Sequence, residues 1–251
     1  MKVDAVVLAG RLNDGKLKEV SDEPLEANIK IAGKPMVEYV LEALMKAKDV
    51  ASVYLVGPRN GLGQYENPRI TVVEAGGDIM ENIKRGLGQC RTDFVLVVTS
   101  DIPLITAPVI DDLMARFEAT GADFCYPVCR KEDVERRYPG SRRTYARVKE
   151  GTYTGGNIFF ARKEIAEKAW PFLTLMVQYR KSPVKMASFL GTWLFLKIAL
   201  GKASVGEIER RVANLLGIVP RAIPDAPPEV GVDVDKPVDY ELCSRVLAST
   251  G

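Results

Sequence analysis

The sequence predicts an α/β fold in three layers, in which a mostly parallel central sheet lies between two layers of helices. Short apolar runs bounded by turn residues alternate with segments of helical period, and strands that alternate with helices usually pair in parallel. The chain of 251 residues, 47% of them apolar, is also large enough to bury one substantial core. We therefore expect a single domain over residues 1–251.

The apolar runs rich in β-branched residues define the expected strands, in chain order. They are residues 3–8, 52–57, 70–73, 94–99, 122–127 and 157–161. Between them, apolar side chains recur at helical spacing on two faces, namely Val37, Val40, Leu41 and Leu44 on the first and Ile110, Leu113, Met114 and Phe117 on the second. The second helix is expected to begin after Thr106, a plausible cap, with Pro108 in its first turn.

A helical insertion is expected near the C-terminus, over about residues 163–217. Its apolar part, "MASFLGTWLFLKIALG", is shorter and more interrupted than the roughly 20 apolar residues that span a bilayer. It precedes a capping box formed by Ser204 and Glu207. We expect residues 184–217 to form a buried helical hairpin. The alternatives are a homo-oligomer interface and a peripheral membrane contact, with the basic residues Arg180, Lys181 and Lys185 beside it.

Residues 130–149 carry eight basic and three acidic side chains, and we expect them to form a basic loop. Such a loop is either solvated or docks an anionic acceptor. Nucleic acid is not an expected partner. Binding of single strands needs aromatic side chains that stack on the bases, and this stretch offers only Tyr138 and Tyr145.

The composition excludes several kinds of chemistry. The chain has no histidine, which excludes Ser-His-Asp and Cys-His hydrolysis and any histidine metal ligand. The cysteines lack C-x-x-C spacing and are expected to be buried thiols: Cys90, Cys125, Cys129 and Cys243. Carboxylates, lysines, arginines and a metal bound through oxygen remain, and Mg²⁺ fits that set best. The start "MKVDAVVLAG" is typical of a first strand rather than a signal peptide, so we expect a cytoplasmic protein.

A carboxylate follows the most apolar strand of the chain. In "VLVVTSDIPLIT", residues 95–106, Asp101 comes directly after a run that is expected to be fully buried. It is either a turn or capping residue or part of a ligand site, since the carboxyl ends of parallel strands form the edge where ligands bind in such sheets.

Two further carboxylates lie close together in "GVDVDKPVDYEL", residues 231–242. Asp233 and Asp235 are two residues apart in an extended segment, so both side chains face the same side. Two such charges are costly to hold together unless a cation or solvent separates them. Alternatively, Asp235 caps a final helix that starts at Pro237.

The order of these motifs resembles the MobA-like NTP transferase family, nucleotidyltransferases of the GT-A type. The motifs are "VVLAG", "IAGKPMVEYVLEAL", "AGGDIMENIKRGL", "VVTSDIPLI", "TGGNIFF" and "GVDVDKPVDYEL", and the resemblance covers about residues 1–110, 150–165 and 231–247. It implies a nucleotide-diphospho-sugar transferase-like sheet, related to Rossmann folds. It also implies that an NTP lies across the carboxyl edge of that sheet. There a phosphate or similar nucleophile of an anionic acceptor would attack the α-phosphorus and release pyrophosphate.

The resemblance also implies roles for individual residues. The nucleoside would contact Leu8, Ala9, Gly10, Gly76, Gly77 and Asn82. The acceptor would lie against Gly155, Gly156 and Asn157. Asp101 would hold Mg²⁺ with help from Asp233 or Asp235. The sequence thus predicts a Mg²⁺-dependent nucleotidyltransferase whose partners are an NTP and a small anionic acceptor.

The chain departs from the family pattern at one charged position. The family places a lysine nine residues before the proline of "GKP", where it lies against the triphosphate, and this chain has Glu26 there. We expect Lys16 to supply the missing charge, with Arg11, Lys18 and Lys30 as alternatives. Two other functions stay open: a GT-A glycosyltransferase that uses a nucleotide-sugar, and a catalytically inactive nucleotide-binding or regulatory protein.

Overall fold

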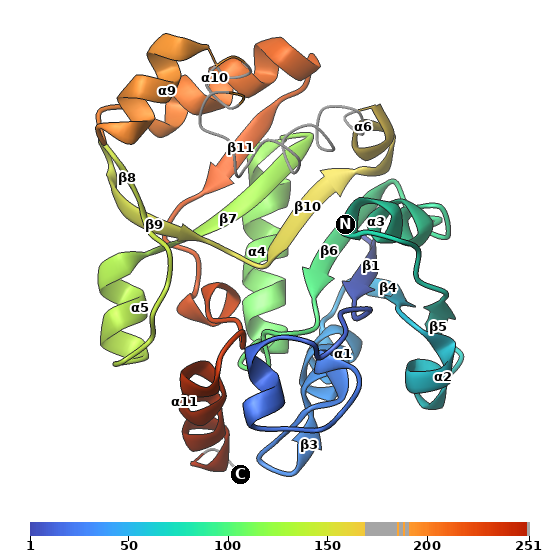
Figure 1. The fold of residues 1–251 in the computed structure, drawn as a ribbon. Helices are drawn as coiled ribbons and strands as arrows, with labels where there is room; N and C mark the ends of the chain where they lie inside the picture. Colours follow the sequence, from blue (N-terminus) through green and yellow to red (C-terminus); the bar gives the residue numbers. More distant parts are fainter. Residues whose placement is uncertain (169–184, 186–187, 189–190, 250–251) are drawn as a thin grey trace.

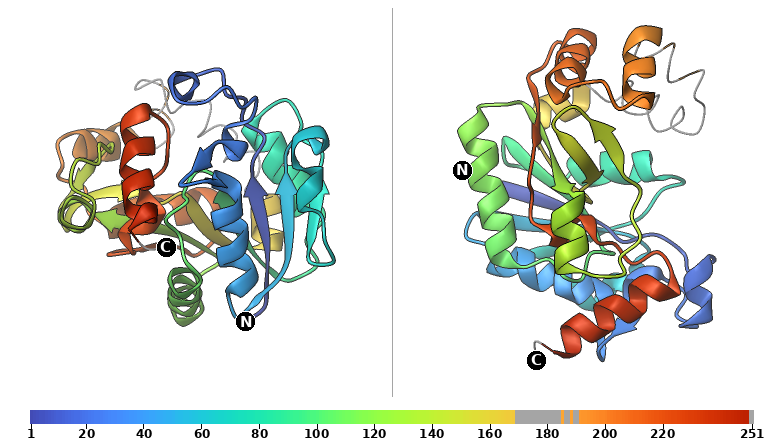
Figure 2. Two further views of the ribbon diagram at one scale, coloured as in Figure 1. Left: turned by 90° about the horizontal axis from the view of Figure 1, so that it is seen from below. Right: turned by 90° about the vertical axis from the view of Figure 1, so that its left-hand side faces the viewer.

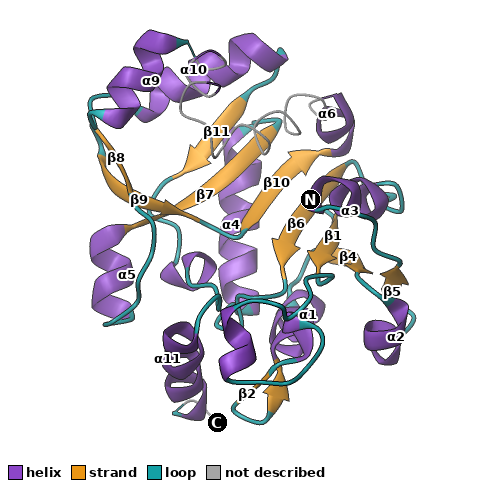
Figure 3. Ribbon diagram, viewed as in Figure 1, coloured by secondary structure: helices purple, strands orange, loops and turns teal. Residues whose placement is uncertain are grey.

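A mixed, mostly parallel sheet forms the centre of the computed structural model, which describes residues 1–168, 185, 188 and 191–249. Within these residues nine strands pair in the order β5-β4-β1-β6-β10-β7-β9-β8, and β11 pairs with β7 (Figures 1 and 3). A separate ribbon of β2 and β3 lies near the C-terminal helix α11.

The helices and strands have the following bounds. In the first half of the chain they are β1 Val3–Leu8, β2 Lys30–Ile31, β3 Lys34–Pro35, α1 Met36–Lys46, β4 Val50–Val56, α2 Arg59–Leu62, β5 Ile70–Val73, α3 Ile79–Leu87, β6 Phe94–Thr99 and α4 Ala107–Thr120. In the second half they are β7 Phe124–Arg130, α5 Lys131–Arg137, β8 Ala146–Val148, β9 Gly151–Gly155, β10 Ile158–Arg162, α6 Lys163–Lys168, α9 Thr192–Ala199, α10 Val205–Leu216, β11 Pro220–Ile223 and α11 Pro237–Ala248. The 3-10 turns are η1 Lys16–Glu19, η2 Glu26–Asn28, η3 Gly63–Tyr65 and η4 Pro228–Gly231.

Strand direction decides which loops meet at one edge of the sheet. β5, β4, β1 and β6 are parallel to one another, and β10 runs antiparallel between β6 and β7. β7 therefore points the same way as β6, and β11 is parallel to β7. The loop after β6 and the segment after β11 consequently emerge at the same edge, which is where the candidate site lies.

Helices cover both faces of the sheet, which confirms the predicted three-layer α/β fold. The apolar faces predicted for the helices at residues 37–44 and 110–117 belong to α1 and α4, and both pack into the larger core. Figure 2 shows helices on both sides of the sheet. On the opposite face, Leu87 of α3 and Ala166 of α6 pack against Val6 and Val97. All four cysteines are buried free thiols, as predicted.

Two predicted helix starts are found in the structure. α4 begins after Thr106 with Pro108 in its first turn, although the Thr106 side chain makes no capping hydrogen bond. At α10, Ser204 and Glu207 form the full capping box. Asp235 is not a cap, because Lys236 takes the N-cap position of α11.

The predicted basic loop at 130–149 is wrong in part. Its residues end strand β7, form helix α5 and begin the hairpin of β8 and β9. The i,i+3 and i,i+4 pairs Arg136–Asp133 and Lys131–Glu135 compensate charge along α5, which explains why so basic a stretch is helical.

Helices α6, α9 and α10 lie within the range of the expected insertion. The predicted buried hairpin is wrong for the part of 184–217 that the structure describes. Neither α9 nor α10 contains a buried residue. Trp193 and Leu196 of α9 and Leu200, which follows the helix, are 72%, 46% and 66% exposed. Residues 169–184, 186–187 and 189–190, with Arg180 and Lys181, lie outside the described residues. No described helix combines the length and the apolar character that crossing a membrane requires.

Candidate active site

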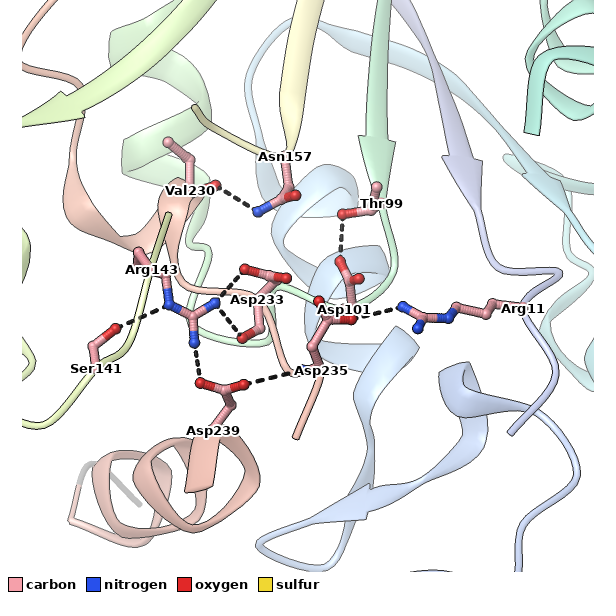
Figure 4. Close-up of polar contacts among 10 residues, drawn as sticks. All are labelled: Arg11, Thr99, Asp101, Ser141, Arg143, Asn157, Val230, Asp233, Asp235 and Asp239. Atoms are coloured by element: carbon pink, nitrogen blue, oxygen red, sulfur yellow. Dashed lines mark hydrogen bonds and ion pairs between the residues drawn. The ribbon is translucent and has the colours of Figure 1, made fainter. Parts of the chain in front are cut away.

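Three carboxylates meet at the carboxyl edge of the sheet. Asp101 follows β6, and Asp233 and Asp235 follow η4 (Figure 4). The amide of Val234 donates to the carbonyl of Asp101 at 2.9 Å, which fixes the two segments side by side. One carboxylate oxygen from each of the three aspartates lies within 4.8 Å of the others. The structure thus brings together the three residues predicted to hold a metal.

The electrostatics of this cluster favour a bound cation. Burial and the nearby charge of Asp233 raise the pKa of Asp101 to about 7, although Thr99 donates a hydrogen bond to it. Burial likewise raises the pKa of Asp233. A hard cation with oxygen ligands would relieve this repulsion, and Mg²⁺ is such a cation. The donor set therefore fits the predicted metal.

A buried arginine supports the cluster from the side. Arg143, 6% exposed, donates to the Asp233 carbonyl at 2.9 Å and also to its carboxylate. Its other terminal nitrogen pairs with Asp239, a 2% exposed residue in the first turn of α11. Asp239 in turn accepts from the amide of Asp235 at 3.3 Å. Arg143 and Asp239 together therefore hold the backbone that carries two of the three carboxylates.

These two residues were missed by the sequence analysis. Arg143 is one of eight basic residues in its stretch, and its partners lie 90 and 96 positions further along the chain. Asp239 had a weak signal, since it lies four residues after Asp235 and just inside a helix that begins with proline.

A second arginine, Arg11, contacts the carboxylates from the loop after β1. It lies 2.6 Å from Asp235 and 3.2 Å from Glu26. Burial acts to raise the pKa of Asp235, but the hydrogen bond and positive charge of Arg11 outweigh it, so this pKa is lowered. Lys16, the predicted source of positive charge, is an exposed residue of η1, and its role stays a prediction. Of the four candidates considered, Arg11 is the one that the structure pairs with the cluster.

The predicted nucleoside-binding residues lie together. Ala9 follows β1, and its amide donates to Val56 of β4. A Cβ on Gly10 would lie 3.3 Å from that of Ala75 and 3.6 Å from the Asn82 amide nitrogen, so Gly10 allows these segments to approach closely. Asn82 accepts from the amide of Gly76 at 2.6 Å, and the Gly77 amide is taken by Glu81 at 2.8 Å. The side chains of α3 thus already order the glycine loop.

The predicted acceptor residues adjoin the carboxylates. The Asn157 carbonyl accepts from Thr99, and its backbone and side-chain nitrogens donate to Val230 at 2.7 and 3.3 Å. The Gly156 amide donates to Pro127 at 2.9 Å. Asn157 therefore connects the end of β6 to the segment that leads into Asp233.

The sheet order and its two layers of helices define the class of the protein as an α/β protein with a nucleotidyltransferase-type fold. The structure resembles that of a hypothetical transferase from Thermus thermophilus, with a TM-score of 0.85 and 36% identity over 96% of this chain and 100% of that one. It also has the fold of a CMP:2-keto-3-deoxy-manno-octonic acid synthetase solved with CTP, at TM-score 0.67 and 14% identity over the whole of both chains.

The family is shown by the sequence comparison. Residues 26–182 match the model of the MobA-like NTP transferase domain, and the chain belongs to that family, as predicted. A probable molybdenum cofactor guanylyltransferase of Thermococcus gammatolerans is 25% identical over 61% of this chain and 81% of its own length. A 2-C-methyl-D-erythritol 4-phosphate cytidylyltransferase of Clostridium perfringens is 30% identical over 44% of this chain, and the match spans about half (52%) of that relative.

Glu26 is expected to make stability depend on pH. Burial raises its pKa to about 7 despite Arg11, and its Oε2 has no hydrogen-bond partner. A pKa above the unfolded value of 4.5 means that stability is fully present below pH 4.5 and falls as pH rises through 7. We expect Glu26→Gln to raise the free energy of unfolding by about 2 kcal/mol at pH 8 and to change it little at pH 4.5.

Urea unfolding at the two pH values measures this effect. Glu19→Gln replaces an exposed glutamate of η1 and serves as the matched control. An equal effect of Glu26→Gln at both pH values would show that the pKa of Glu26 is not raised in the folded protein.

Proposed function

We propose that this protein is a Mg²⁺-dependent GT-A-type nucleotidyltransferase. It transfers NMP from an NTP to a phosphorylated or otherwise anionic acceptor and releases pyrophosphate. The observation that carries the proposal is the trio of carboxylate oxygens within 4.8 Å of one another at the carboxyl edge of the sheet. That edge is the ligand-binding edge of open α/β sheets, and the chain belongs to an NTP transferase family.

In this proposal the acceptor oxygen bonds to the α-phosphorus while the bond from that phosphorus to the bridging oxygen breaks, and pyrophosphate takes the electron pair. Mg²⁺, held by Asp101, Asp233 and Asp235, would neutralise charge on the phosphate oxygens. Arg11, which pairs with Asp235 at 2.6 Å, would bind the anionic phosphates. Gly10 and Asn82 border the nucleoside, and Asn157 borders the acceptor.

Nucleotide binding to the full chain tests this function. Calorimetry and thermal unfolding measure it with ATP, GTP, CTP and UTP. The relatives are named as guanylyl- and cytidylyltransferases, so GTP and CTP are tested first. We expect one NTP to stabilise the protein by about 2.7 kcal/mol at a concentration 100 times its Kd, and to require Mg²⁺.

The alternatives predict other outcomes of the same titration. A nucleotide-sugar that binds more tightly than any NTP would favour a glycosyltransferase. Binding of an NTP without pyrophosphate release from any acceptor would favour an inactive regulatory protein. If no NTP binds in the presence of Mg²⁺, the proposed function is wrong. The cytoplasmic location, and an oligomer or membrane contact through 184–217, stay predictions.

A further inference from the structure

An apolar cavity of about 490 Å³ lies beside the C-terminal half of the sheet. Its lining residues come from β7, β9 and β10 of the sheet and from α10 and β11, and Figure 1 shows where these elements lie. Phe124 and Phe159 line the sheet side, and most of the other lining side chains are apolar, with Glu209 and Arg221 as the charged exceptions. The volume is within the usual range of about 300–1,000 Å³ for small-molecule sites.

Helix α10 directs an apolar face at this cavity without burying it. Ile208, Val212 and Leu216, spaced four residues apart, line the cavity, yet no residue of α10 is buried. A helix of this length gains most of its stability from packing its apolar face. Removing more of the apolar surface of these three side chains from water would therefore stabilise the protein. A bound apolar group would supply that contact.

The cavity borders a residue that is predicted to contact the acceptor. Gly155 lines it together with Tyr126 and Thr154. A Cβ on Gly155 would lie 2.2 Å from the Tyr126 hydroxyl, so the tyrosine rests directly on this glycine.

The segment that packs against Thr154 leads into the carboxylate cluster. A Cβ on Gly231 would lie 3.2 Å from the Thr154 methyl, and Gly231 is two residues before Asp233. Burial raises the pKa of Tyr126, with smaller contributions from Cys129 and Asp233. Tyr126 thus lines the apolar cavity and also senses the negative charge of Asp233.

We propose that the acceptor is an anionic amphiphile, whose charged head lies at the carboxylate cluster and whose apolar chain occupies this cavity. The inference rests on the proposed nucleotidyltransferase function and names its acceptor class. A fully polar acceptor would gain nothing from an apolar cavity, whereas each buried methylene of a chain contributes to binding through the hydrophobic effect. The head supplies the attacking oxygen, and the chain fixes its position.

Calorimetry with the full chain, Mg²⁺ and the NTP that binds tests this proposal. Octyl phosphate, below its micelle concentration, is compared with ethyl phosphate. We expect octyl phosphate to bind at least about 30-fold more tightly, because its longer chain is buried. Equal affinities would overturn the proposal.

Variants of α10 locate the binding site. Val212→Trp fills the cavity and is expected to reduce the chain-length preference to about 3-fold or less, and Ile208→Phe is a milder second variant. Leu215→Trp is the matched control, since Leu215 is 37% exposed and does not line the cavity. A chain-length preference that survives in both cavity variants would overturn the assignment of this cavity.

NTP binding by the same samples separates a failure of the proposed acceptor from a failure of the proposed function. Retained Mg²⁺-dependent NTP binding in the variants shows that they fold and that the nucleotide site is intact. NTP binding without any chain-length preference would refute the amphiphilic acceptor alone. Absence of NTP binding in the wild type would instead refute the proposed function.

Discussion

Asp101→Asn is expected to lower the rate of Mg²⁺-dependent pyrophosphate release by about 10³-fold. The substitution keeps the shape of the side chain and the contact with Thr99 but removes the charge. Asp101 is the carboxylate that β6 itself places at the edge of the sheet, and its carbonyl also accepts from Val234 of the other segment. Loss of its charge therefore weakens the metal site while the backbone that forms it stays in place.

Two measurements separate this effect from unfolding. Calorimetry gives the Mg²⁺ dependence of NTP binding, and a coupled assay gives pyrophosphate release with the acceptor that a screen identifies. Asp49→Asn is the matched control, because Asp49 precedes β4 at the opposite edge of the sheet and forms a surface pair with Lys2. Metal-dependent turnover at the wild-type rate in Asp101→Asn would refute the role of this residue.

The sheet could be predicted from the sequence where strands are buried on both faces. The bounds of β1 and β6, and also of the edge strand β5, are those predicted, because apolar runs end at turn residues. Besides the ribbon of β2 and β3, the strands that were missed are β8, β9 and β11, which are short and include glycine, threonine and arginine. β9 and β11 pair with β7, which is distant in the chain, and local composition does not reveal such partners.

The site, like the sheet, could be predicted only where a local sequence pattern marked its residues. Asp101, Asp233 and Asp235 each had a local signal, a strand end or a two-residue spacing. Arg143 had none, because what distinguishes it from its exposed neighbour Arg142 is burial against two distant carboxylates. Likewise, Arg11 and Lys16 are equivalent as charges in the loop, and only tertiary structure pairs Arg11 with Asp235.

Arg143→Met is expected to cost about 3–5 kcal/mol of stability, because it leaves the Asp239 carboxylate buried without its cation. It is also expected to weaken Mg²⁺ binding by about 10–100-fold, the usual effect of removing a group that orients a metal ligand. Urea unfolding and calorimetric Mg²⁺ titration with bound NTP measure the two effects. Arg142→Met, the exposed neighbour, should change neither.

A second substitution distinguishes positioning of the ligand from general stability. In Arg143→Met combined with Asp239→Asn the buried carboxylate is neutral, so we expect about 2 kcal/mol of stability to return. The affinity for Mg²⁺ should stay low, because Asp233 still lacks the two hydrogen bonds that Arg143 donates to its carbonyl and carboxylate. If metal affinity recovered together with stability, Arg143 would act on the fold alone. If it stayed low in a stable protein, Arg143 would be a positioning residue of the metal site.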